Sequence, residues 1–146
     1  MKEIDLPVDK YIGIDIVKDI IVCNKVTYSN PSREFLELNI IEDELSGADL
    51  ILCRDCFVHL SFANCQKILK NFRNSGSKYL LTTTFTDRSH NDGLGKVFWR
   101  TINLELPTFN FPKPISIINE DCTEYDGNYT DKSLGLWLLK DIHNSP

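Results

Sequence analysis

The chain has 146 residues, 42% of them apolar, and a formal net charge of −5 at pH 7. This length suits one domain, and the composition lies outside the disordered range. Non-specific nucleic-acid binding needs clustered Lys and Arg, which an acidic chain does not favour. No apolar run reaches the roughly 18 residues of a membrane span, and residues 1–5 lack the layout of a signal peptide. We expect a single cytoplasmic domain over residues 1–146, with neither nucleic acid nor membrane as a partner.

The cysteine count also favours the cytoplasm, because five is an odd number and fits reduced thiols better than a disulfide framework. Cys53 and Cys56 have the spacing of a CxxC pair. Zinc would need a second pair of ligands at metal spacing, which the sequence lacks, so no metal is expected. A thioredoxin-like redox pair is one alternative. The other is two thiols that pack as small hydrophobes at the end of a strand.

In chain order, short apolar runs alternate with segments of helical periodicity. Strands are expected at 10–16, 34–38, 48–53 and 78–84, and helices at 17–28, at 41–45 for a single turn, and at 62–72 after the capping residue Ser61. The run 48–53 is continuously apolar, which is typical of a parallel strand buried on both faces. This alternation predicts a parallel sheet flanked by helices.

The last third of the chain follows a different pattern. Periodicity fails over 86–114, which is rich in Gly and Pro, so this segment is expected to be a functional loop that its aromatic residues keep ordered. Two apolar runs follow, at 115–118 and 134–139, with a turn at 126–128 between them, and they predict a closing antiparallel hairpin. The fold class is therefore α/β, with a Rossmann-like, mostly parallel sheet and a C-terminal antiparallel hairpin.

Two polar residues follow the first two strands. Asp15 can accept hydrogen bonds from both hydroxyls of a ribose, or it can simply cap the next helix. Asn39 can bind an adenine amino group, or it can occupy a turn, where Asn is favoured locally.

A third polar group follows the buried strand 48–53. Ligands of open α/β sheets bind outside the carboxyl ends of the strands. Arg54 can hold a carboxylate in a bidentate manner, Asp55 can accept a hydrogen bond from a cationic amine, and His59 can act as a base. The alternative is a salt-bridged loop in which His59 fills a packing site.

In order and spacing, these segments resemble class I methyltransferases that depend on S-adenosylmethionine. The resemblance rests on Tyr-Ile-Gly-Ile-Asp at 11–15, Asn-Ile at 39–40, Ala-Asp-Leu-Ile-Leu-Cys-Arg-Asp at 48–55, Val-His-Leu at 58–60 and Ser-Lys-Tyr-Leu-Leu-Thr-Thr-Thr-Phe at 77–85. It covers 11–85 well and continues through Trp99-Arg100 and Asn103-Leu104 in a subgroup of bacterial members.

The resemblance implies roles for particular residues. Asp15 would bind the cofactor ribose. Asn39, where the family usually has Asp, would contact adenine, with Ile16 and Ile40 flanking the ring. The segment from Cys53 through Arg54 to Asp55 would line the methionine end and the methyl-transfer site. Contacts to the substrate are expected from Trp99, Arg100 and Asn103, although Trp99 could equally pack over the sheet.

One family feature is missing from this sequence. The family's first strand ends in a glycine-rich loop and leads into a helix, a unit of about 30 residues, and the residues before Lys10 contain no glycine. In the family that strand lies between those matching 11–15 and 49–53. We therefore expect an N-terminally truncated methyltransferase domain with two unpaired inner edges. Another chain could fill the gap, for example in a homodimer, or strands 11–15 and 49–53 could pair directly.

The expected function is methyl transfer from S-adenosylmethionine to a small molecule, which depends mainly on positioning. If the acceptor must lose a proton, Asp55 or His59 would be the base. A second hypothesis is a catalytically inactive remnant that acts as an interaction module. A third hypothesis is a nicotinamide-dependent Rossmann enzyme, which would lack the C-terminal antiparallel hairpin.

Overall fold

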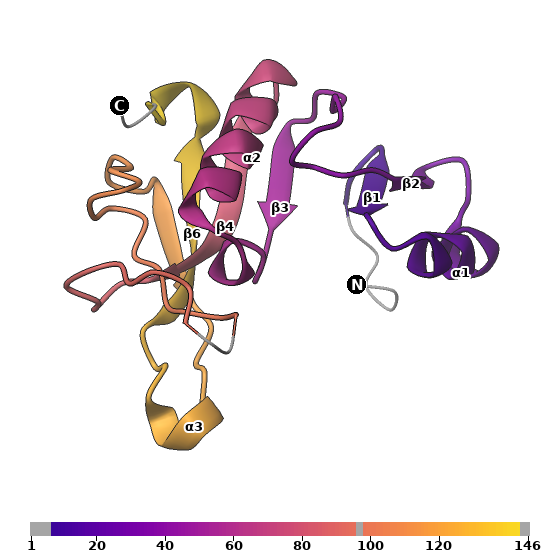
Figure 1. Ribbon diagram of the computed structural model, residues 1–146. Helices are drawn as coiled ribbons and strands as arrows, with labels where there is room; N and C mark the ends of the chain where they lie inside the picture. The colour runs from indigo at the N-terminus through magenta and orange to yellow at the C-terminus, as the bar shows by residue number, and fades with distance from the viewer. Residues whose placement is uncertain (1–6, 96–97, 144–146) are drawn as a thin grey trace. The chain divides into compact units, whose positions relative to one another are not determined.

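The protein is described by a computed structural model that covers residues 7–95 and 98–143 (Figure 1). The chain divides into two compact units, Met1–Asp43 and Glu44–Pro146, here called the N-terminal and the C-terminal unit. The strands form two sheets, one of two strands in the order β1-β2 and one of four strands in the order β3-β4-β6-β5. Each unit contains one of the sheets.

The N-terminal unit is the strand–helix–strand motif that the sequence predicts. Its elements are β1 (Tyr11–Asp15), α1 (Lys18–Tyr28) and β2 (Arg33–Glu37). The two strands are parallel, and Ile21 of α1 and Phe35 of β2 form its buried core. Gly13 allows the Phe35 ring to lie against β1, because a Cβ at position 13 would come within 2.7 Å of that ring.

The prediction of a single helical turn at 41–45 is wrong. The backbone N–H groups of Glu42 and Asp43 both donate to the carbonyl of Asn39, at 3.0 and 2.8 Å. The Asn39 side chain also accepts from the N–H of Ile41, at 3.0 Å. This local hydrogen bonding starts a non-helical turn two residues earlier than periodicity indicates.

The C-terminal unit contains the remaining elements in the order β3 (Leu50–Cys53), η1 (Phe57–His59), α2 (Phe62–Asn74), β4 (Tyr79–Phe85), β5 (Ser116–Asn119), α3 (Glu124–Gly127), β6 (Lys132–Leu138) and η2 (Leu139–Asp141). Strand β3 is parallel to β4, whereas β6 is antiparallel to both β4 and β5. The predicted C-terminal hairpin is therefore confirmed. An all-parallel sheet, which the nicotinamide hypothesis requires, is not what this unit forms.

Helix α2 forms as predicted and lies over one face of the four-stranded sheet (Figure 1). The hydroxyl of Ser61 accepts from the N–H of Asn64 at 3.2 Å, which satisfies one of the donors that a helix leaves unpaired at its start. The apolar side of the helix is buried, through Cys65, Ile68, Leu69 and Phe72.

The segment 86–114 contains no helix or strand in its described part, as expected from its composition. Its apolar residues nevertheless belong to the core, because Ile102, Leu104 and Phe109 are each at most 1% exposed. The Trp137 indole of β6 donates to the carbonyl of Pro112 at 2.8 Å. This loop is therefore ordered by packing against the sheet.

The prediction that strand 48–53 is buried on both faces is wrong. Leu50 and Leu52 are 46% and 44% exposed, whereas Cys53, on the α2 side, is 7% exposed. In the part of the chain that the structure describes, strand β3 pairs with β4 alone within its sheet, and β1 pairs with β2 alone within the other. Each sheet therefore ends in a strand that has one free side among the described residues of its unit.

Candidate functional site

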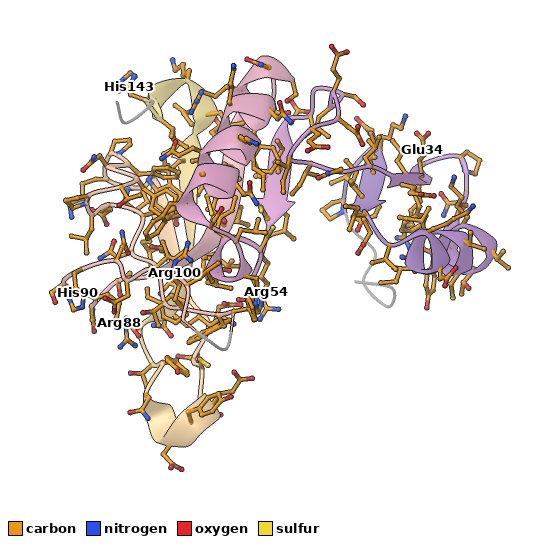
Figure 2. All side chains as sticks on the ribbon, in the orientation of Figure 1. Glu34, Arg54, Arg88, His90, Arg100 and His143 are labelled. Atoms are coloured by element: carbon orange, nitrogen blue, oxygen red, sulfur yellow. The ribbon has the colours of Figure 1, made fainter. Side chains whose placement is uncertain are left out.

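The loop that follows β3 positions the charged residues that the sequence singled out. Figure 2 shows Arg54 at the carboxyl end of β3. Asp55 has a φ of 53°, in the left-handed region that Asp tolerates better than most residues. Its backbone N–H donates to the hydroxyl of Thr83 on β4 at 2.8 Å, which holds the loop against the end of the sheet.

Arg54 and Asp55 belong to a network of four charged residues, here called the charged cluster, with Glu120 and Lys132. The Lys132 ammonium lies 2.9 and 3.0 Å from the two carboxylate oxygens of Asp55. The Arg54 Nε donates to Glu120 at 2.6 Å, and this hydrogen bond is the main reason that the pKa of Arg54 is raised. The Lys132 ammonium also lies 3.8 Å from a carboxylate oxygen of Glu120, so the four residues are connected.

The antiparallel hairpin is what brings Glu120 and Lys132 to this loop. Lys132 begins β6 and lies opposite Phe85, the last residue of β4. The amino end of β6 therefore meets the carboxyl ends of β3 and β4. Sequence reasoning missed both residues, because Lys132 is 77 positions from its partner Asp55. Glu120 and Lys132 could have been found as two charged residues at the ends of the predicted hairpin strands that lie next to the turn.

His59 lies at the end of η1 and is exposed, so it does not fill a packing site. Its Nδ1 lies 3.1 Å from the carbonyl oxygen of Phe98. A carbonyl only accepts, so in the neutral imidazole Nδ1 carries the proton and Nε2 is an acceptor. This tautomer is the one that a base using Nε2 requires.

Trp99 belongs to an aromatic cluster with Phe85, Tyr125 and Tyr129. The Trp99 ring centroid lies 5.0 Å from that of Tyr129 and 6.1 Å from that of Phe85, both in edge-to-face geometry. Tyr125 extends the cluster at 5.5 Å from Tyr129 and is 73% exposed. Trp99 thus packs on the end of β4, as the packing alternative expected, and also borders an exposed aromatic surface.

The other two expected substrate contacts are buried. Arg100 is 5% exposed, and its guanidinium lies 4.2 Å from the ring centroid of Phe62 and donates to the carbonyl of Leu60 at 2.6 Å. Burial lowers the pKa of Arg100. Asn103 is 6% exposed and donates to the carbonyls of Thr86 and Arg88. Both side chains therefore hold the segment 86–114 in place.

The residues expected to bind adenosine lie at one end of the two-stranded sheet of the N-terminal unit. Asp15 ends β1, and its Oδ1 accepts from the N–H of Val17 at 2.8 Å in the turn that leads into α1. Val17 is itself the N-cap residue of α1, so this bond lies before the first helical turn and Asp15 is not the capping residue. Asn39 follows β2 at the same end, in the turn described above. Ile16 is 63% exposed, and Ile40 is half-buried.

A hollow of about 520 Å³ lies at the opposite end of the same unit, beside Lys10, Lys25 and Arg33. Nucleotides bind at the carboxyl ends of strands in open α/β sheets, so this hollow is not the adenosine site. Within residues 7–95 and 98–143, no group of three or more His, Cys, Asp or Glu side chains is placed to hold a metal ion.

Solved structures match this chain in fold, whereas no protein-family model and no curated protein matches its sequence. The N-methyltransferase NodS from Bradyrhizobium japonicum WM9 matches with a TM-score of 0.59 and 12% identity, over 88% of this chain and 72% of that one. The pyocyanin biosynthetic protein PhzM matches with a TM-score of 0.63 and 11% identity, over 88% and 42%. CalO1, a methyltransferase of calicheamicin biosynthesis solved with S-adenosylhomocysteine bound, matches with a TM-score of 0.59 and 12% identity, over 87% of this chain and 40% of that one.

The chain therefore has the fold of S-adenosylmethionine-dependent methyltransferases, as the sequence resemblance implied. At these identities the likeness is one of fold. The chain spans about two fifths of the length of PhzM and of CalO1. Among the described residues, no helix is both long enough and apolar enough to cross a membrane.

Proposed function

We propose that this chain is a methyltransferase domain that binds S-adenosylmethionine and acts on a small molecule. The observation that carries the proposal is the four-stranded sheet, in which antiparallel β6 lies between β4 and β5 and brings a charged cluster to the carboxyl end of β3. This end of an α/β sheet is where ligands bind.

The residues of the N-terminal unit suit the adenosine half of the cofactor. A carboxylate has about four lone-pair sites, so Asp15 can accept from ribose hydroxyls while it also accepts from the N–H of Val17. The exposed side chain of Ile16 offers an apolar surface to the adenine ring, with Asn39 and Ile40 as further contacts.

The residues of the C-terminal unit suit the methionine half and the acceptor. S-adenosylmethionine supplies a methyl group on a sulfonium that is itself the leaving group, so the protein mainly positions and desolvates the reactants. Arg54 has further donors beside the Nε that bonds Glu120, and these can hold a carboxylate next to Cys53. Lys132 contacts both carboxylate oxygens of Asp55, which suits Asp55 to orienting a donor group. His59, with Nε2 as an acceptor, is the better candidate for taking a proton.

Titration calorimetry with S-adenosylhomocysteine tests the cofactor assignment. Asp15→Asn keeps an oxygen that can accept from the N–H of Val17 but loses acceptor sites for ribose, so its affinity is expected to fall about 10-fold to 100-fold, the range given by a loss of about 1.5–3 kcal/mol. Asp19→Ala, in the first turn of the same helix, is the matched control and is expected to bind like the wild type. Equal affinities for wild type and Asp15→Asn would contradict the assignment.

The second candidate function is an inactive methyltransferase remnant that serves as an interaction module. The free side of β3 favours it, because exposed strand edges readily pair with other chains. Such a module would retain the fold by circular dichroism and show no heat of binding with S-adenosylhomocysteine.

We also propose a cytoplasmic location, in keeping with five cysteines that are all free, and association into a homodimer.

A further inference from the structure

Cys53 and Cys56 lie on either side of a two-residue turn made by Arg54 and Asp55. The residues that flank such a turn are within about 7 Å of each other, measured between Cα atoms. A disulfide spans about 4.4–6.8 Å between Cα atoms. The backbone therefore already places the two cysteines at the separation that a disulfide needs.

Contacts to β4 and η1 hold the turn on both sides. Cys53 pairs with Thr82 in the sheet, and the Thr82 hydroxyl donates to the Cys53 carbonyl at 2.7 Å. The Asp55 N–H is held by Thr83, and the Cys56 carbonyl accepts from the N–H of His59 at 3.1 Å. The two cysteines therefore keep their separation without help from a disulfide.

The two thiols differ in exposure and in acidity. Cys53 is 7% exposed, whereas Cys56 is half-buried. The Cys53 S–H donates towards the Cys56 sulfur, which lowers the pKa of Cys56 and raises that of Cys53. The outer thiol is thus the better nucleophile, with a protonated thiol beside it.

The nearby Cys65 differs from this pair. It is fully buried in α2, its sulfur donates towards the carbonyl of Phe57 at 3.6 Å, and burial raises its pKa to about 12. A buried thiol of this kind is inert, so Cys65 serves as an internal control.

We propose that Cys53 and Cys56 are a redox site that forms a reversible disulfide when the protein meets a hydroperoxide. The Cys56 thiolate attacks one peroxide oxygen, the O–O bond breaks, and the second oxygen leaves as hydroxide and takes a proton to become water, or an alcohol from an organic hydroperoxide. Cys53 then attacks the sulfenic sulfur of Cys56, the S–S bond forms, and the sulfenic hydroxyl leaves with the Cys53 proton as water. Two electrons pass from the two sulfurs to the peroxide, and a dithiol reverses the change.

The disulfide would close a ring around Arg54 and Asp55, which are the two members of the charged cluster on this turn. Oxidation is therefore expected to change the ion pair between Arg54 and Glu120 and the ion pair between Asp55 and Lys132. The site does not depend on the proposed methyltransferase function, because it requires neither cofactor nor acceptor.

Peptide mapping of the full chain tests the proposal. The reduced protein is treated with hydrogen peroxide, its remaining thiols are alkylated, and it is digested with trypsin without reduction. Trypsin cleaves after Arg54, so the two cysteines fall in different peptides, 34–54 and 55–67. The expected result is that these peptides are linked, that two of the five thiols escape alkylation, and that dithiothreitol separates the peptides.

Cys65 lies in the same peptide as Cys56, so a Cys65→Ala variant identifies the bonded sulfur. The variant is expected to give the same linked pair, whereas Cys56→Ser gives none. Two outcomes would overturn the proposal. In the first outcome, peptides 34–54 and 55–67 are recovered separately and in alkylated form, whereas Cys23 or Cys122 is oxidised. The other is loss of the linked pair in Cys65→Ala.

Discussion

At the scale of single residues, the charges after β3 required partners, and the fold supplies them from the far end of the chain. Two unpaired charges beside a buried strand would be costly. Glu120 and Lys132 are 14% and 15% exposed in their side chains, and they meet Arg54 and Asp55 within the charged cluster. The alternative of a salt-bridged loop therefore describes part of the arrangement, and the same residues remain the candidates for ligand binding.

Lys132→Met is expected to lower the free energy of unfolding by about 2 kcal/mol, because it leaves the mostly buried Glu120 and the partly buried Asp55 short of a positive partner. Lys10→Met is the matched control, since Lys10 pairs with Glu34 on the surface, where the side chains are 58% and 47% exposed. That change is expected to cost about 0–0.5 kcal/mol. Urea denaturation measures both, and equal losses would contradict a structural role for the charged cluster.

At the scale of elements, β6 is the strand on which the C-terminal unit depends. It pairs with β4 on one side and β5 on the other, and its Trp137 is 1% exposed. Gly135 lies under that indole, and a Cβ there would come within 2.1 Å of a ring atom. The hydrogen bond from Trp137 to Pro112 limits how far the ring can move away.

Gly135→Ala is therefore expected to destabilise the protein by about 3 kcal/mol through overpacking. Gly93→Ala provides the comparison, because a Cβ at position 93 meets nothing within 4 Å, and its effect should stay within about 0.5 kcal/mol. Thermal and urea unfolding of the two variants give the comparison. A Gly135→Ala variant as stable as the Gly93→Ala variant would show that the indole does not constrain the strand.

At the scale of the whole molecule, the C-terminal unit presents an apolar sheet face opposite α2. The strand registers align its side chains in rows across the sheet, and none of them is fully buried. They are Leu50, Leu52, Tyr79, Leu81, Ile118, Leu134, Leu136 and Leu138. Parallel sheets are normally covered on both faces, and apolar patches of this kind mark interaction surfaces. The charged residue that β6 adds to this face is Lys132, at one end, where it is paired with Asp55. Two copies with a net charge of −5 can therefore approach each other over the apolar rows.

Sedimentation velocity is therefore expected to show a concentration-dependent dimer for the wild type and a shift towards monomer for Leu52→Lys. Val26→Lys, at an 84% exposed position of α1, should leave the equilibrium unchanged. A wild-type chain that stays monomeric over the whole concentration range would contradict association through this face.

The sequence by itself determined the local elements and their order. Periodicity placed α1, α2 and most strands, the capping residue Ser61 marked the start of α2, and the apolar runs near the end gave the hairpin. Local hydrogen bonding and packing are encoded within a few residues, so a single sequence reveals them. The positions of Asp15, Asn39, Arg54 and Asp55 at strand ends were predictable for the same reason.

Only the tertiary structure decided which distant residues meet. The pairing of Lys132 with Asp55, the burial of Arg100 and Asn103, and the exposure of Leu50 and Leu52 all depend on the order of strands in the sheets. A strand's composition does not state which of its sides will be paired, nor which face a neighbouring element will cover. A continuous apolar run therefore predicted burial on both faces of β3, whereas the structure leaves one face and one side of that strand open.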